Sequence, residues 1–442
     1  MVLRRGKYKK QIISDILTKC YLAVCFLLSC YNLQAQDIIP LAQDTITISI
    51  PDAEQRFVSK NLTLLMDKYN VNIAQSAYLQ AKLWYNPNLS YGTTLYNQES
   101  KRFFDNRYPA SGEVDNTFQL QQLISIAGKH SANAKLAKVG VKQAEYQLAD
   151  VLRSLKYQMY TDISDLYSNQ QQIAMYQSEE IKIKHLIEST QELYKVGNAA
   201  GNDVVRLQAQ YQDIIAQEVT SEQGVVNDEK DLKTLLVYPE KTYLVVKEVI
   251  TAPTSIPPYQ AILDSAVKNR PDLMLAQTGV AYQDQNLKLQ RSTGVPDLTL
   301  GISNIGAGSV IPNYWGISAN IDLPFFNRNQ GNISSAMYQK SQAEINDSLA
   351  LNTVKNDVTG AYSTFYNINK QVKQIDADYE KNLDEMIDNA IKNYDKRYIN
   401  LLDLLSQVTT YIDGKNNLIT LKVQYFNAIH SINYSTGIDI IK

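Results

Sequence analysis

The positions of its prolines limit this chain more than any other sequence feature. All twelve prolines of the 442 residues lie at or before Pro109, or between Pro239 and Pro324. Proline lacks a backbone N–H and clashes with the preceding helical turn, so helix interiors exclude it. The proline-free tracts 110–238 and 325–442 are therefore free to form helices much longer than those of ordinary globular domains.

Apolar residues in both tracts recur at coiled-coil spacing. In the second tract the seven-residue positions are Val358, Phe365, Val372, Tyr379 and Met386, and in the first they are Leu152, Met159, Leu166 and Ile173. Such a repeat predicts helices that pack along a seam. We expect helices at 52–85, 128–196, 202–236, 259–292, 331–396 and 401–434. The helix at 128–196 alone would extend roughly 100 Å.

Four segments between the predicted helices alternate apolar with small or polar residues, as β-strands with one apolar face do. We expect strands at about 88–97, 116–126, 296–304 and 313–323. Two soluble hairpins would also explain the pattern. In lipid, however, four strands would leave open edges with unpaired backbone groups. Three copies of the chain would supply about twelve strands, enough for a closed, water-filled barrel.

The sequence contains an internal duplication. Tyr394 follows Tyr194 by 200 residues, and Asp403 follows Asp203 by the same spacing. This predicts two equivalent repeats, each with two strands, a long helix, a turn and a returning helix. The predicted segments after residue 35 are an N-terminal periplasmic segment 36–51, a first repeat 52–240, a linker 241–258 and a second repeat 259–442.

The N-terminus has the pattern of a secretory signal. Five basic residues lie within the first ten, an apolar run follows from Cys20 to Leu28, and Ala35 provides a cleavage site. We therefore assign 1–35 as a signal peptide, because the run is too short to span a bilayer. A short buried helix of a cytosolic domain is the alternative. Cys30 could instead be a lipidation site.

Composition excludes several functions. A formal net charge of -2 gives no electrostatic reason to expect nucleic acid. His130, His185 and His430 lie far apart and are expected on helix surfaces or in packing, so neither a metal site nor a cofactor site is predicted. No nucleophile and base spacing or phosphate loop is present, so no catalytic residues are predicted and the chain is not expected to be an enzyme. The alternative functions are those of a secreted coiled-coil adhesin or scaffold without a pore and of a periplasmic hydrolase.

The two predicted turns resemble those of a known family. Tyr194-Lys195-Val196-Gly197, followed by Asp203-Val204, is similar to the first periplasmic turn of TolC-type outer-membrane factors, and the segment from Tyr394 to Leu405 is similar to the second. The resemblance covers about residues 52–439. It implies a homotrimer with a twelve-stranded barrel in the outer membrane of a Gram-negative cell, and a helical tunnel through the periplasm.

The resemblance also implies partners and site residues. The partners would be outer-membrane lipid, a periplasmic adaptor (membrane fusion) protein and, indirectly, an RND pump of the inner membrane. The residues expected to contact the adaptor are Tyr194, Val196, Gly197, Tyr394, Lys396, Arg397 and Tyr398. Asp403 and Asp203 would line the closed aperture, although a solvated surface carboxylate would also explain Asp403.

Two positions depart from the family pattern. Arg397 stands where the second turn often has glycine, and Ser406 stands where a second acidic ring is often found. The stretch 396–402 looks more like the ducts of cobalt-zinc-cadmium and copper export systems than those of drug exporters. It favours heavy-metal cations as cargo, and export of drugs or type I secretion of proteins is the alternative.

Overall fold

The computed structural model describes residues 44–93, 95–97, 101–104, 116–247, 256–306 and 314–441. The predicted signal peptide, Cys30, residues 36–43 and much of the linker lie outside the described residues. The chain divides into two units, of which the smaller comprises 1–46 and 241–243. Its described residues, 44–46 and 241–243, include the first residues of strands β1 (Asp44–Ile48) and β6 (Thr242–Val246), which form a two-stranded sheet.

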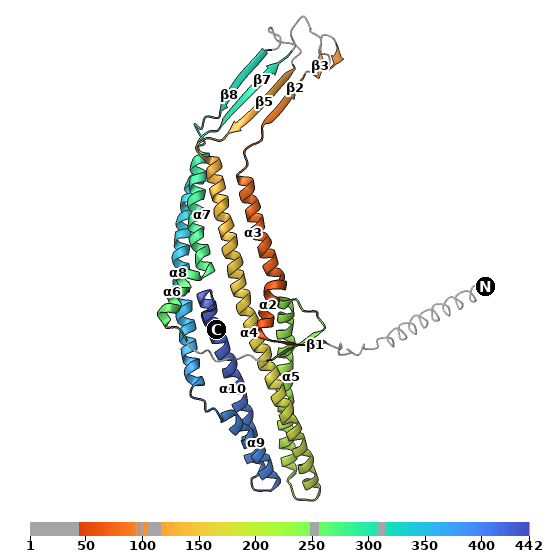
Figure 1. The fold of residues 1–442 in the computed structure, drawn as a ribbon. Coiled ribbons are helices and arrows are strands. Elements are labelled where there is room, and N and C mark those ends of the chain that lie inside the picture. The colour runs from red at the N-terminus through yellow and green to blue at the C-terminus, as the bar shows by residue number, and fades with distance from the viewer. Residues whose placement is uncertain are drawn as a thin grey trace, which may run out of the picture. The chain divides into compact units, whose positions relative to one another are not determined.

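The larger unit, 47–240 and 244–442, is mainly helical with a small β part, which confirms the predicted fold class. Its helices are α2 (Ile50–Lys60), α3 (Leu62–Ala81), α4 (Lys129–Lys195), α5 (Gly201–Leu236), α6 (Tyr259–Asn269), α7 (Pro271–Thr293), α8 (Gln330–Val372), α9 (Tyr379–Asp395) and α10 (Leu401–Thr436). In the larger unit the strands between residues 88 and 124 and between 298 and 321 lie at one end of the helices, and the α4–α5 and α9–α10 turns lie at the other end (Figure 1).

The helices nearest the strands are packed in a row. α3 contacts α4, α4 contacts α7, and α7 contacts α8. Nearer the turns, α4 packs on α5 and α10, and α10 packs on α9. Among the described helices, none has a stretch both long and apolar enough to cross a bilayer.

Four antiparallel strands form one sheet in the order β2-β5-β7-β8. Their bounds are β2 (Asn88–Gly92), β5 (Thr117–Ile124), β7 (Leu298–Ile305) and β8 (Tyr314–Ile321). The predicted strand at 88–97 is wrong in part. Tyr96–Asn97 (β3) leaves this sheet and pairs with Arg102–Phe103 (β4) in a separate hairpin.

The register places most apolar residues of the four strands on one face, and Leu123, Ile305 and Tyr314 are the exceptions. Paired positions run from Leu89 through Leu120 and Ile302 to Ile317, all apolar, whereas the neighbouring row runs through Ser90, Gln119, Ser303 and Gly316. Side chains directly opposite in a ladder share a face. The predicted period-two alternation therefore produces a sheet with one apolar and one polar side.

Three predicted helices are each interrupted. The expected helix at 52–85 is α2 and α3, separated at Asn61 and ending at Ala81. The side chain of Asn61 accepts the N–H of Leu64 at 2.9 Å, and its amide donates to the carbonyl of Leu235 at 2.8 Å. Asn61 thus caps α3 and fixes the junction to α5.

The expected helix at 259–292 is α6 and α7. Pro271 stands in the first turn of α7, where a missing N–H costs nothing. The preceding Arg270, only 2% exposed, pairs with Asp272 at 2.5 Å and with Asp357 of α8 at 2.8 Å. This buried cation ties the junction to the neighbouring helix.

Where one helix is expected at 331–396, the chain forms two, α8 and α9. The prediction of one continuous apolar seam is therefore wrong beyond Val372. Val358 and Phe365 are buried as predicted, but Tyr379 is 40% exposed. In the break, the N–H of Asp378 donates to the Asp376 carboxylate at 3.0 Å. Short aspartate side chains compete in this way with helical backbone hydrogen bonds, so a helix can end without proline.

Two of the apolar clusters among the described residues join helices of the larger unit. The core near the turns joins α4, α5, α9 and α10, and its most buried members are Ile183, Leu186, Leu207, Ile214, Ile387, Leu404 and Val408. The other joins α6, α7, α8 and α10 through Ile262, Leu273, Val354, Val358 and Ile432. Both tracts therefore contribute to the helix packing, as the seams predict.

Candidate functional site

The turn after α4 is closed by two backbone hydrogen bonds. The N–H of Gly197 donates to the carbonyl of Tyr194 at 3.0 Å, and the N–H of Asn198 donates to that of Leu193 at 2.8 Å. This pair of bonds is the Schellman motif, which requires a residue in the left-handed region. Gly197 provides it with φ 74°, and glycine does so without steric cost.

The turn after α9 repeats the same geometry 200 residues later. The N–H of Arg397 donates to the carbonyl of Tyr394 at 2.8 Å, and the N–H of Tyr398 donates to that of Asn393 at 2.8 Å. Arg397 has φ 61°. For a residue with a Cβ, this conformation costs roughly 1–2 kcal/mol. The duplication therefore extends to individual hydrogen bonds, and the second turn keeps a cation at the strained position.

The residues predicted at the two turns are mostly exposed. Tyr194, Val196 and Tyr398 are 54%, 69% and 75% exposed. The further exposed residues are Gly197, Lys396 and Arg397. Tyr394 differs, because it is half-buried and its hydroxyl lies 3.4 Å from Oγ1 of the buried Thr190 on α4. Six of the seven residues are thus available at the surface, and Tyr394 ties α9 to α4.

Two exposed apolar residues beside the turns were not predicted. Val205 follows the first turn and Leu402 follows the second, and both side chains are largely exposed. They stand outside the seam positions of their helices. An apolar residue off the seam of an amphipathic helix was the available sequence signal.

Asp203 and Asp403 each lie in the first turn of a helix, α5 and α10. Asp403 is exposed, and its N–H donates to Oδ1 of Asn400 at 3.0 Å, whereas Asp203 is half-buried. Negative charge near a helix N-terminus is favourable by a fraction of a kcal/mol. Within the described part of the chain neither carboxylate has an ion pair. Both are therefore positioned by their helix starts and remain free to interact elsewhere.

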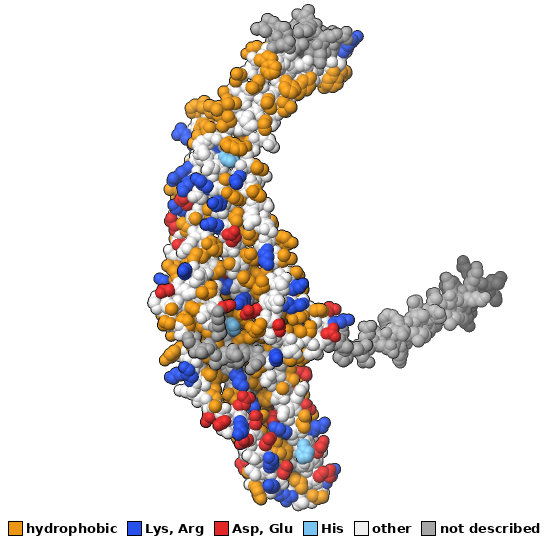
Figure 2. Space-filling model, in the orientation of Figure 1, with side chains coloured by type: hydrophobic (Ala, Val, Ile, Leu, Met, Phe, Trp, Pro, Cys, Tyr) orange, Lys and Arg blue, Asp and Glu red, His pale blue; other side chains and the backbone are white. Residues whose placement is uncertain are grey.

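The apolar face of the sheet is uncovered in the single chain. Its exposed side chains include Leu89, Phe118, Leu120, Ile302, Trp315 and Ile317. Figure 2 shows hydrophobic side chains gathered over the sheet, whereas charged side chains gather on the helices. Contiguous exposed apolar surface marks contact with a membrane or another protein.

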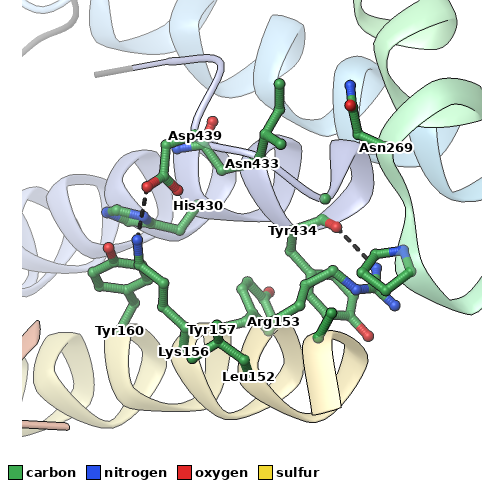
Figure 3. Close-up of a pocket in the computed structure, with 14 residues that line it drawn as sticks. Leu152, Arg153, Lys156, Tyr157, Tyr160, Asn269, His430, Asn433, Tyr434 and Asp439 are labelled. Atoms are coloured by element: carbon green, nitrogen blue, oxygen red, sulfur yellow. Dashed lines mark hydrogen bonds and ion pairs between the residues drawn. The ribbon is translucent and has the colours of Figure 1, made fainter. Parts of the chain in front are cut away.

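A cavity of about 340 Å³ lies among α4, α10, the start of α7 and the segment after Gly437 (Figure 3). His430 stacks on Tyr160 with ring centroids 3.6 Å apart, and Lys156 pairs with Asp439 at 2.7 Å. Burial lowers the pKa of His430 to about 4 and, together with a hydrogen bond to Glu54, raises the pKa of Tyr160. His430 is therefore neutral near pH 7 and acts in packing.

Of the other two histidines, His130 stacks on Trp84 with ring centroids 4.6 Å apart, and His185 is exposed. In the described ranges, no three His, Cys, Asp or Glu side chains are placed to hold a metal ion together. The surfaces that distinguish this chain are therefore the uncovered sheet face and the two turns.

A duplicated helical hairpin with an amphipathic sheet at one end summarises the geometry of the chain, and comparisons with known proteins show what it is similar to. Residues 55–236 match the model of the outer membrane efflux protein family. Outer membrane protein TolC of Salmonella enteritidis is 24% identical over 282 residues, which are 59% of this chain and 56% of that protein. The chain therefore spans a little over half the length of this relative. By family model, by sequence relatives and by fold, the chain is therefore similar to TolC-like outer-membrane factors.

Solved structures share the fold. The structure of CusC matches with a TM-score of 0.69 at 15% identity, covering 88% of this chain and 92% of that chain. The CmeC outer membrane channel of Campylobacter jejuni matches with a TM-score of 0.70 at 18% identity, covering 88% of this chain and 85% of that one. The family consists of outer-membrane efflux channels, which are not enzymes.

The equivalent turns give a matched pair of variants. Arg397→Gly should stabilise the protein by about 1 kcal/mol, because it removes the cost of a Cβ at positive φ. Gly197→Ala should destabilise it by a similar amount. Denaturant unfolding of the purified protein measures both changes. A loss of stability in Arg397→Gly would show instead that contacts of the arginine side chain outweigh its backbone cost.

Proposed function

We propose that this chain is one subunit of the outer-membrane exit duct of a tripartite efflux system, which conducts its cargo passively across the periplasm and the outer membrane. The observation that carries this proposal is the sheet with an uncovered apolar face. Within the described residues, strands β2 and β8 each have a neighbour on one side only. In lipid such edges leave backbone groups unpaired, so the sheet must be completed by other copies.

The helices support the same assembly. α3 lies at one edge of the helix row and carries an exposed apolar stripe at seam spacing through Leu62, Met66, Tyr69 and Ile73. α8, at the other edge, exposes Tyr338, Ile345 and Leu349. A chain with different apolar stripes on its two edges can join head to tail with copies of itself, and such contacts form a ring where the rotation between copies closes.

A homotrimer is the assembly that the family resemblance implies. Three copies would bring about twelve strands together, enough for a barrel with a water-filled lumen. The apolar faces would then contact outer-membrane lipid, and the polar faces would line the lumen. The helices would extend the duct into the periplasm of a Gram-negative cell, to which a cleaved signal peptide at 1–35 would export the chain.

Ion conductance in planar bilayers and the molecular mass of the purified protein test the assembly. The purified mature protein should form trimers that conduct ions in planar bilayers. Tyr69→Asp should reduce the trimer fraction at least tenfold, because it places an unpaired carboxylate in an apolar contact. Asn70→Asp adds the same charge beside the stripe and should leave the trimer intact. A wild-type protein that is monomeric and gives no current would refute the proposed duct.

We place the aperture at the turns, where Asp403 is the better candidate because it is more exposed than Asp203. In a trimer, three copies of Asp403 around one axis would attract cations and repel one another. Aperture width would then depend on ionic strength, since salt screens this repulsion.

Asp403→Ala should therefore lower both the resting conductance and the preference for cations over anions, because it removes the mutual repulsion that widens the aperture and the attraction for cations. Asp413→Ala, which removes an exposed carboxylate further along α10, is the matched control and should change neither quantity. Both are measured as single-channel conductance and reversal potential in a salt gradient. If the two variants behave alike, Asp403 is an ordinary surface residue.

The turns are also the surface that we assign to a periplasmic adaptor protein, which would connect the duct to an RND pump of the inner membrane. Exposed Tyr194, Val196 and Tyr398, with Lys396 and Arg397 beside them, combine apolar contact area with positive charge. Tyrosine and arginine are enriched at binding hot spots. The exposed apolar residues beside the turns enlarge the apolar part of this surface.

Heavy-metal cations are the cargo that we favour, because the second turn, 396–402, resembles those of metal-export ducts. A duct for drugs or for type I secretion of proteins is the alternative, and the cargo must be distinguished by growth.

Deletion of the gene should lower tolerance to zinc, cobalt, cadmium or copper more than tolerance to bile salts and dyes. The intact chain should restore metal tolerance. Tyr398→Glu should fail to restore it and yet conduct normally in bilayers, since it alters the adaptor surface and not the pore. Loss of drug tolerance alone would overturn the metal assignment, and full rescue by Tyr398→Glu would overturn the adaptor surface.

A further inference from the structure

A carboxylate between the turns and the sheet is cut off from water. Glu179 of α4 has a side chain that is only 1% exposed. Its Oε1 accepts from Nζ of Lys182 at 2.8 Å, whereas its Oε2 is fully buried and has no hydrogen-bond partner among the described residues. A buried carboxylate oxygen without a donor destabilises the ionised form of the group.

Lys182 has a second carboxylate within reach. Its Nζ lies 3.7 Å from Asp388 of α9, whose side chain is 59% exposed. The same ammonium group is thus shared between a buried partner on its own helix and an exposed partner on the neighbouring helix. The shorter contact is to Glu179, so the cross-helix pair is the weaker of the two.

α9 depends on such contacts for its position, because the break after Val372 separates it from α8. On one side Lys415 of α10 pairs with Asp384 at 2.9 Å and with Glu380 at 3.3 Å. Towards α4, the described residues offer the Lys182 pair, the Thr190–Tyr394 contact and the shared apolar core.

The charged and titratable groups around this point come from three helices. They are Glu179 and Lys182 of α4, Asp384 and Asp388 of α9, and Tyr411 and Lys415 of α10. Burial raises the pKa of Glu179, its hydrogen bond to Lys182 opposes the rise, and the charges of Asp388 and Asp384 add to it. Burial also raises the pKa of Tyr411, which stays protonated and donates to Asp384 at 3.1 Å.

We propose that Glu179 and Lys182 form a proton-controlled tie between α4 and α9. When Glu179 is ionised, it holds Lys182 on α4. When Glu179 takes a proton from solvent, its charge–charge attraction to Lys182 is lost, and only a hydrogen bond from the ammonium group to a neutral carboxyl group remains. Lys182 then moves towards Asp388 and holds α9 more tightly to α4.

This inference rests on the proposed duct, and it adds regulation of conduction by pH. Since α9 leads into the turn that carries Arg397 and precedes Asp403 of α10, a firmer hold on α9 favours the closed aperture. The duct should therefore conduct less when the periplasmic side is acidic. The raised pKa of Glu179 sets the direction: the proton binds on acidification, and the tie loosens as the pH rises through that pKa.

The first test is bilayer conductance over a periplasmic pH series from about 8 to about 5. The wild-type conductance should fall at least twofold on acidification. Glu179→Gln, which mimics the protonated side chain, should give the low value throughout, and Asp388→Asn should give the high value throughout. Asp413→Asn is the matched carboxylate control and should keep the wild-type pH response. An unchanged response in Glu179→Gln would overturn the proposal.

Two further measurements test the Glu179–Lys182 tie independently of the aperture carboxylate and of the proposed duct. Asp403→Asn should retain the fall in conductance, because the aperture carboxylate is not the proton acceptor of the tie. Hydrogen exchange of the Tyr379–Asp395 amides, corrected for intrinsic rates, should slow on acidification in the wild type and not in Asp388→Asn. If neither the wild type nor any variant conducts but this exchange pattern is observed, the proposed duct is refuted and the proton-controlled tie is supported. If conduction is normal and the exchange pattern is absent, only the tie is refuted.

Discussion

Backbone hydrogen bonding at the edges of the four-stranded sheet is the constraint on which the rest of this structure depends. The strands can satisfy one another internally, but β2 and β8 each keep an unpaired side within the described chain. Water could satisfy those groups, yet the apolar face beside them does not favour water. Completion by identical copies satisfies both requirements. It also explains why α3 and α8, at the edges of the helix row, expose apolar stripes that nothing in the described part of the single chain covers.

Below the sheet, the two repeats have diverged while keeping their hydrogen-bond geometry. α4 is continuous over 67 residues, whereas its counterpart is divided into α8 and α9. One turn uses Gly197 at positive φ and the other uses Arg397. The second repeat therefore contains both the more loosely connected helix and the charged turn. This asymmetry places adjustable contacts, such as those of Lys182, between a rigid first repeat and a more independent second one.

The sequence predicts the features that depend on spacing. Proline positions and seven-residue repeats predict the long helices, and period-two alternation predicts a sheet with one apolar side. Features that depend on single side chains escaped prediction. Asn61 divides a helix by capping the next, and Asp376 supports the break before α9, because these side chains bond the local backbone in either state. The role of Glu179 was equally hidden, since a glutamate between seam positions is usually solvated.

The strained arginine also limits the symmetry that a partner can recognise. In the proposed trimer, six turns of nearly identical backbone would surround the axis, which approximates sixfold order. Only alternate turns would carry a guanidinium group, so the electrostatic pattern is threefold. A binding protein with six equal arms would contact two chemically distinct kinds of binding site. Its arms would have to bind in two ways or leave one kind of site unoccupied.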